Sequence, residues 1–158
     1  MKAKEVLSKR EKILDDYERG FGLPSIHLFD ANEELQNYFI MDRSQVEKLS
    51  SYECSVISFR LSQYAFQMQR YVNRERSVAI YAESQLASIV SNHINDFDKY
   101  TKHEVKVESI CKENVAAREW KQIILYAKQR VERINELSQG INNLAYRISM
   151  VQKHKEEK

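Results

Sequence analysis

The chain has 158 residues, of which 42% are hydrophobic and 30% charged, and it contains three glycines and one proline. So few turn residues exclude an ordinary β-sandwich or barrel and favour helices throughout. The formal net charge of +2, from 25 basic and 23 acidic residues, by itself predicts neither a nucleic-acid partner nor an acidic substrate. No apolar run approaches the roughly 20 residues that span a bilayer, and the charged N-terminus lacks the apolar segment of a signal peptide. We therefore expect a soluble, cytoplasmic protein with no membrane partner.

Short helices are expected in the first third of the chain. A charged helix over about residues 2–19 should end in the Gly/Pro loop at 20–25, where GFGLPS carries the strongest turn signals. After Asp30 the sequence ANEELQNYFIM should form a second helix, because acidic residues stand in its first turn, where the helix dipole favours them. Residues 1–49 are therefore predicted to be an N-terminal helical extension.

A long helix is predicted over about residues 44–91. Asp42, Ser44 and Glu47 form an N-terminal cap signal, and apolar residues then recur at spacings of three and four from Ile57 to Ile89. A second apolar row beside the first makes the stripe wider than a two-stranded coiled coil needs, which favours a bundle. The polar segment 91–104 should reverse the chain, and VKVESI at 105–110 is expected to be a loop or the start of the next helix.

The second long helix is predicted over about residues 108–152, where apolar residues alternate at spacings of three and four from Trp120 to Val151. Arg130 is the one charged residue at a position of this apolar series. Gly140 costs roughly 1 kcal/mol against alanine inside a helix, or else permits the close approach of a partner. The two long helices should form an antiparallel hairpin, which makes the predicted fold all-α with short N-terminal helices.

The hairpin, residues 50–155, is expected to oligomerise through its apolar stripes. Burying one Leu or Ile stabilises by roughly 1.5–3 kcal/mol, and stripes this broad are too apolar for a hairpin alone. We therefore predict a homo-oligomer. The predicted oligomerisation residues are Trp120, Ile134, Leu137, Ile141, Leu144 and Ile148.

Motifs of enzymes and metal proteins are missing from the sequence. The four histidines form no HxxH or HExxH pattern, Cys54 and Cys111 stand far apart, and no GxxxxGK[ST], GxGxxG or GxSxG occurs. Carboxylate pairs stand in segments without the apolar surroundings that acid–base catalysis needs. We predict a protein that is not an enzyme, has no cofactor or metal, and keeps both cysteines as free packing thiols.

Basic residues interleaved with aromatic residues mark both long helices. This mixture is typical of proteins that bind single-stranded DNA, because cations neutralise phosphates and exposed rings stack on bases at roughly 1–3 kcal/mol each. The alternative is that the tyrosines are half-buried and that the arginines pair with Glu75, Glu132 or Glu136. The predicted DNA contacts are Arg70, Arg74, Arg76, Lys121, Lys128 and Arg133.

Two segments resemble the UvsY-type recombination mediators of tailed phages: SYECSVISFRLSQYAFQMQRYVNRERSVAIYAESQLASI and NVAAREWKQIILYAKQRVERINELSQGINNLAYRISMVQKHK, within about residues 50–155. The resemblance implies a small oligomer, usually a ring, that binds single-stranded DNA. It also implies that the protein weakens the grip of single-strand-binding protein and helps to load a RecA-like recombinase, in the host cytoplasm if it is phage-encoded. Residues 79–90, which correspond to a basic segment of that family, contain no Lys or Arg.

The function predicted from the sequence is that of a recombination mediator. The alternative is a helical structural or adaptor protein that binds only protein partners. Both functions require an oligomeric helical bundle, so composition does not separate them.

Overall fold

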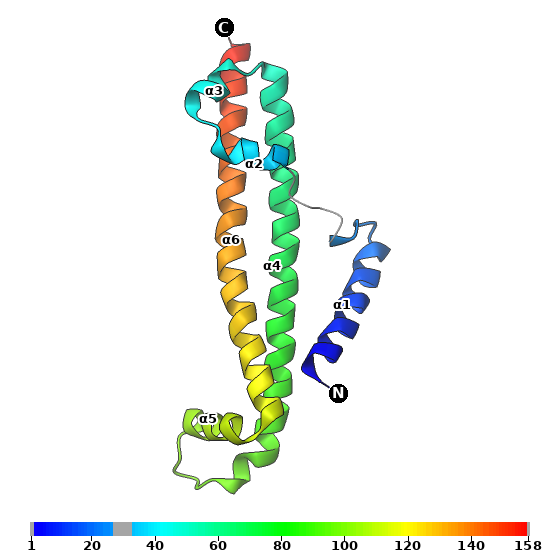
Figure 1. The fold of residues 1–158 in the computed structure, drawn as a ribbon, viewed down its shortest axis with the longest axis vertical. Coiled ribbons are helices and arrows are strands. Elements are labelled where there is room, and N and C mark those ends of the chain that lie inside the picture. The colour runs from blue at the N-terminus through cyan, green and yellow to red at the C-terminus, as the bar shows by residue number, and fades with distance from the viewer. Residues whose placement is uncertain (1, 27–32, 158) are drawn as a thin grey trace. The chain divides into compact units, whose positions relative to one another are not determined.

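The computed structural model describes residues 2–26 and 33–157, and the described chain is helical without strands (Figure 1). The all-α fold class is therefore confirmed. Asp30 and Asn32, the two residues that the sequence places to cap the second predicted helix, lie outside the described residues. In chain order the elements are α1 (Ala3–Gly20), α2 (Glu33–Ile40), α3 (Arg43–Lys48), α4 (Ser51–His93), the 3₁₀ turn η2 (Ile94–Asp96), α5 (His103–Glu113) and α6 (Val115–Glu156).

The chain divides into two compact units. Unit 1 combines Met1–Leu23 with Asn73–Glu132, and unit 2 combines Pro24–Val72 with Arg133–Lys158. In each unit a part of α4 runs antiparallel to a part of α6 (Figure 1), as the predicted hairpin requires.

Unit 2 is built on an apolar core between α4 and α6. Leu61 and Ala65 of α4 are fully buried, and Ile148 of α6 is 2% exposed in the same cluster. Two hydroxyl groups join the backbones directly: Ser138 Oγ donates to the carbonyl of Ala65 at 3.0 Å, and Ser58 Oγ donates to that of Ala145 at 2.9 Å. Small residues at these points allow the two helices to approach closely.

Unit 1 packs α1 and α5 against its parts of α4 and α6. Ala3 of α1, Ala82 of α4 and Trp120 of α6 form one buried cluster, in which the rings of Tyr81 and Trp120 meet edge to face at 5.9 Å. α1 ends in the predicted loop, where Gly22 has a φ of +76°. A left-handed backbone of this kind favours glycine.

The first long helix was predicted over residues 44–91, and the predicted start at residue 44 is wrong. The structure has α3 there, a break at Leu49 with ψ 147°, and then α4 from Ser51. The break follows from a capping box at Ser50: Glu53 accepts from the backbone N–H of Ser50 at 2.7 Å, and the N–H of Glu53 donates to Ser50 Oγ at 3.2 Å.

The second predicted long helix, over 108–152, is also wrong in its start. Residues 103–113 form the separate helix α5, which includes the VKVESI segment, and α6 begins at Val115. Asn114 ends α5 with ψ 115°, and its side-chain oxygen accepts from the N–H of Ala117 at 3.0 Å, which caps α6. A single asparagine therefore separates α5 from α6, ahead of the apolar series that begins at Trp120.

Candidate interaction groove along helix α6

Two of the predicted DNA contacts are buried on α4. Arg70 is 6% exposed and donates to Gln67 Oε1 and to the carbonyl of Pro24, both at 2.9 Å. Arg70 was predicted to contact DNA, but in this structure its guanidinium group is buried and ties the start of unit 2 to α4.

Arg74 is also 6% exposed, and it holds α1 to α4 in unit 1. Its guanidinium nitrogens lie 2.9 Å from Glu11, 2.6 Å from Asp15 and 3.1 Å from Glu18. Burial opposes the charge of Arg74, but the hydrogen bonds with Glu18 and Asp15 raise the pKa of Arg74 above its ordinary value. Arg74 is therefore a structural cation, and the expectation that it is exposed is wrong.

Lys121 and Lys128 of α6 are engaged with carboxylates in unit 1. Lys121 pairs with Glu108 of α5, and this hydrogen bond raises the pKa of Lys121. Lys128 Nζ lies 2.6 Å from Glu83. Arg130, outside the predicted set, lies 2.9 Å from Glu75, which is the pairing expected in the alternative interpretation.

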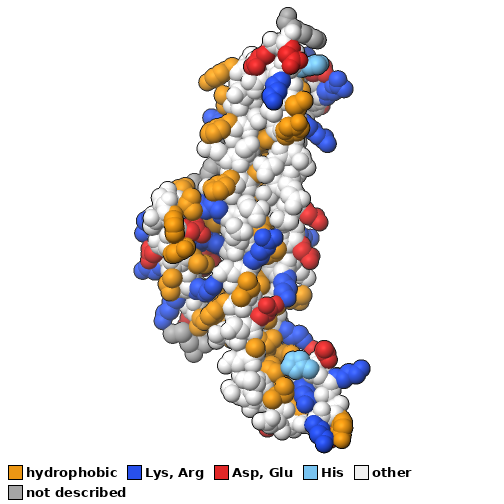
Figure 2. Space-filling view, turned by 180° about the vertical axis from the view of Figure 1, so that it is seen from behind, with side chains coloured by type: hydrophobic (Ala, Val, Ile, Leu, Met, Phe, Trp, Pro, Cys, Tyr) orange, Lys and Arg blue, Asp and Glu red, His pale blue; other side chains and the backbone are white. Residues whose placement is uncertain are grey.

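Arg76 and Arg133 remain exposed, and the structure records no hydrogen bond or ion pair for either with a described residue. Arg76 lies in unit 1 and Arg133 in unit 2. On the face seen in Figure 2, blue Lys and Arg side chains are interspersed with red Asp and Glu side chains. That face therefore mixes both signs of charge.

The predicted oligomerisation residues divide into core and surface positions. Trp120, Ile141 and Ile148 are 7%, 8% and 2% exposed and belong to the cores of their units. Ile134 and Leu144 are half-buried, and Leu137 is 56% exposed. Much of the stripe that the sequence offers for oligomerisation is thus used inside the single chain.

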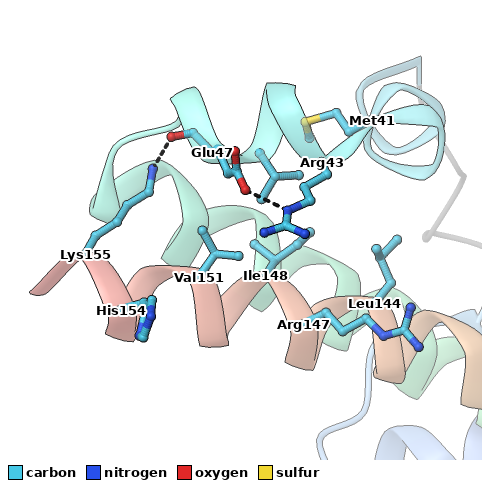
Figure 3. Close-up of a pocket in the computed structure, with 10 residues that line it drawn as sticks. Met41, Arg43, Glu47, Leu144, Arg147, Ile148, Val151, His154 and Lys155 are labelled. Atoms are coloured by element: carbon cyan, nitrogen blue, oxygen red, sulfur yellow. Dashed lines mark hydrogen bonds and ion pairs between the residues drawn. The ribbon is translucent and has the colours of Figure 1, made fainter. Parts of the chain in front are cut away.

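Unit 2 carries a groove along α6, which we name the α6 groove. It consists of two hollows of about 760 Å³ and 570 Å³ that share Leu144. Figure 3 shows the larger one, in which Leu144, Ile148 and Val151 rise from α6 toward α3. The lining residues are Met41, Arg43, Val46, Glu47, Leu144, Arg147, Ile148, Val151, His154 and Lys155 in the larger hollow, and Phe39, Arg133, Glu136, Leu137, Gly140, Ile141 and Leu144 in the smaller.

Cations outnumber carboxylates around the α6 groove. Arg43 pairs with Glu47, whose carboxylate is 2.7 Å away, whereas Lys155 Nζ donates to the backbone carbonyl of Glu47 (Figure 3) and to that of Leu49. Arg147 is exposed, with no recorded hydrogen bond or ion pair to a described residue. The groove therefore combines an aliphatic floor with a basic rim.

An exposed aromatic row on α4 was missed by the sequence analysis. Tyr52, Phe59 and Phe66 are 78%, 63% and 53% exposed, and they repeat every seven residues. This interval places them on one side of the helix, away from the buried positions Cys54 and Leu61. The seven-residue interval was visible in the sequence, but periodicity alone does not say which of several apolar rows faces the core.

Metal-ligating side chains do not cluster in the described part of the chain. No group of three or more His, Cys, Asp or Glu side chains there could hold a metal ion. Cys54 and Cys111 are free and buried, and burial raises the pKa of both thiols. Among the described helices none is both long and apolar enough to cross a membrane.

Comparison with protein-family models, with curated proteins and with solved structures gave no match.

Proposed function

We propose that the protein is a non-enzymatic helical adaptor that self-associates and binds protein partners through its exposed helix faces. The single observation that carries this proposal is the aromatic row of Tyr52, Phe59 and Phe66 on α4. Aromatic side chains bury about 150–250 Å² each, so the row offers several hundred Å² of apolar surface, the size at which an exposed patch marks an interaction site.

The row suits a second copy of the same helix. A seven-residue interval keeps a stripe facing one partner helix, with successive rings about 10.5 Å apart. The positions between the rings on this face hold Ser55, Val56, Ser62 and Gln63, which are uncharged. Large rings alternating with small side chains can interdigitate with their own symmetry mate, so the row supports a homo-oligomer.

Light scattering coupled to size exclusion tests this assembly. Phe59→Glu with Phe66→Glu should lower the mass of the oligomer while the circular dichroism stays helical, because both rings are exposed in the single chain. Tyr100→Glu is the matched control, since Tyr100 is 83% exposed but lies outside the row. A wild-type monomer at micromolar concentration, or an unchanged mass for the double variant, would contradict the proposal.

A second candidate function is recombination mediation with direct contact to single-stranded DNA. It is favoured by Arg76 and Arg133, the two predicted DNA contacts that are exposed with no recorded partner among the described residues. An oligomer would present several copies of each arginine to one strand. A recombinase and a single-strand-binding protein as partners follow from the sequence resemblance alone.

Fluorescence anisotropy with a labelled oligothymidylate tests DNA binding. We expect the affinity to fall between about 50 and 200 mM salt, and Arg76→Ala with Arg133→Ala to reduce the slope by about 0.7 per lost phosphate contact. Lys128→Ala is the control, because Lys128 is already paired with Glu83. If the wild type does not bind at low salt, the mediator function fails and the adaptor function remains.

A further inference from the structure

We propose that the α6 groove binds an amphipathic helix of a partner protein in which acidic residues flank the apolar anchors. This site is separate from the aromatic row of α4, and it defines the chemistry of a ligand, which the adaptor function leaves open. Four observations support it: the course of the groove, its aliphatic floor, an open glycine within it, and the excess of cations on its rim.

The course of the groove matches a helix. Its two hollows follow α6 from Arg133 to Lys155 and meet at Leu144. At 1.5 Å per residue this stretch is about 33 Å long, which accommodates about six helical turns. A helix bound in such a groove would place the apolar side chains at positions i, i+3, i+4 and i+7 against the groove floor.

The floor of the groove favours an apolar helix over nucleic acid. It is formed by Leu144, Ile148 and Val151 of α6, with Val46 of α3 and Met41 on the opposite wall. Aliphatic side chains accept Leu or Ile anchors, whereas bases require exposed ring faces on which to stack. Among the lining residues, aromatic rings stand only at the ends of the groove: Phe39 in the smaller hollow and the imidazole of His154 in the larger.

Gly140 gives a partner backbone a point of close approach. It lines the smaller hollow in the interior of α6, and a Cβ atom added at this position would meet nothing within 4 Å. A glycine costs about 1 kcal/mol there compared with alanine, and no contact inside the described chain requires it. An empty glycine position in a groove suits a helix that packs across it.

The rim selects the charge of the partner. Four Lys and Arg side chains and two Glu side chains line the groove, so two cations are in excess. The cations are Arg43, Arg133, Arg147 and Lys155, and the carboxylates are Glu47 and Glu136. Opposite charges on the flanks of a docked helix speed association and disfavour partners of the wrong sign. The groove should therefore prefer glutamate beside the apolar anchors, and reject lysine.

Fluorescence polarisation of the full chain with a designed peptide tests the proposal. The probe is a labelled helix of about four turns with leucines at i, i+3, i+4 and i+7 and glutamates at the flanking positions. A matched peptide carries lysine in place of each glutamate. We expect the acidic peptide to bind about tenfold more tightly than the basic one, which corresponds to about 1.4 kcal/mol.

Two variants locate the binding. Gly140→Trp adds a large ring at a position of the smaller hollow where a Cβ atom meets nothing within 4 Å, and it should weaken binding of the acidic peptide about tenfold while helix content is kept. Arg133→Glu with Arg147→Glu should reverse the preference in favour of the basic peptide. Arg76→Glu, an exposed position of unit 1, is the control for each charge change, and Phe59→Glu should leave peptide binding intact even where it alters the oligomer.

Equal binding of the two peptides, or binding unaffected by Gly140→Trp, would overturn the proposal. So would competition by oligothymidylate that Gly140→Trp abolishes, because the groove would then be a nucleic-acid site. A loss of oligomer mass in Gly140→Trp would likewise overturn it, since a second copy of the chain would then be the occupant.

Discussion

The two units hold their helices together by different means. In unit 1, Arg74 joins α1 to α4 through three carboxylates, and Lys121, Lys128 and Arg130 of α6 each have an acidic partner. In unit 2 an apolar cluster and two serine-to-carbonyl hydrogen bonds join α4 to α6, while Arg133 and Arg147 remain at the surface with no recorded partner among the described residues. On α6, the cations Lys121, Lys128 and Arg130 of unit 1 are paired, whereas Arg133 and Arg147 of unit 2 are accessible to ligands.

This difference shows that residue type alone does not assign a role to a basic residue. Arg74 and Arg133 are both arginines on long helices with aromatic residues nearby in sequence. The first meets Glu11, Asp15 and Glu18, and the second meets no recorded carboxylate in the described chain. A cation becomes available for binding only where the fold leaves it without a counter-charge.

The largest expected effect is the loss of stability caused by placing a charge in the core of unit 2. Ile148→Asp should lower the free energy of unfolding by about 4 kcal/mol or more, because the fully buried side chain would become an unpaired charge. Leu137→Asp, at a position that is 56% exposed on the same helix, should cost less than about 1 kcal/mol. Urea unfolding followed by circular dichroism measures both, and equal costs would contradict the division into core and surface.

A somewhat smaller effect is expected from breaking the ionic contact of unit 1. Arg74→Ala should cost about 2 kcal/mol, less than a fully buried ion pair because its three carboxylates are 20–40% exposed. Released from Arg74, α1 should withdraw Ala3 from the cluster around Trp120, the one tryptophan of the chain, and the emission of Trp120 should shift to longer wavelength. Arg76→Ala is the control, and an unchanged emission in Arg74→Ala would show that apolar contacts alone hold α1.

A gain in stability is expected where the α6 groove is open. Gly140→Ala should raise the free energy of unfolding by about 1 kcal/mol, because the added methyl group meets nothing and alanine is the better helix former. Gly22→Ala is the matched control and should not stabilise, since the φ of Gly22 is +76°. Thermal unfolding of both variants measures the contrast, and destabilisation by Gly140→Ala would contradict an open position.

The smallest effect concerns the cap of α3 beside the groove. Hydrogen bonds from the backbone of Gln45 and from Ser44 hold the pKa of Asp42 below its ordinary value. A group whose pKa is lowered in the folded state stabilises above its unfolded pKa, and this contribution is lost as the pH falls through the folded pKa. The protection factors of the α3 amides, which are corrected for the intrinsic pH dependence of exchange, should therefore fall between about pH 5 and pH 2, and less so in Asp42→Asn, which keeps the cap without titrating there.

The helices themselves could be predicted from the sequence, because helical periodicity depends on residues three and four positions apart. The errors were the two breaks, at Leu49 and Asn114. In both places the cap is local, a Ser50–Glu53 capping box and an asparagine, and it lies ahead of the apolar row, which begins at Ile57 or at Trp120. The apolar rows therefore do not mark these two breaks, whereas the local cap residues do.

The sequence by itself determined an all-α chain with antiparallel long helices, since a helix forms from short-range hydrogen bonds and one apolar face. Only the tertiary structure decided which arginines are free. Arg74 pairs with carboxylates that are 56–63 residues away in the sequence, and no local sequence pattern predicts contacts over such a separation. It also decided that Ile148 lies in the core while Phe59 faces outward, because several apolar rows compete and side-chain packing between helices selects among them.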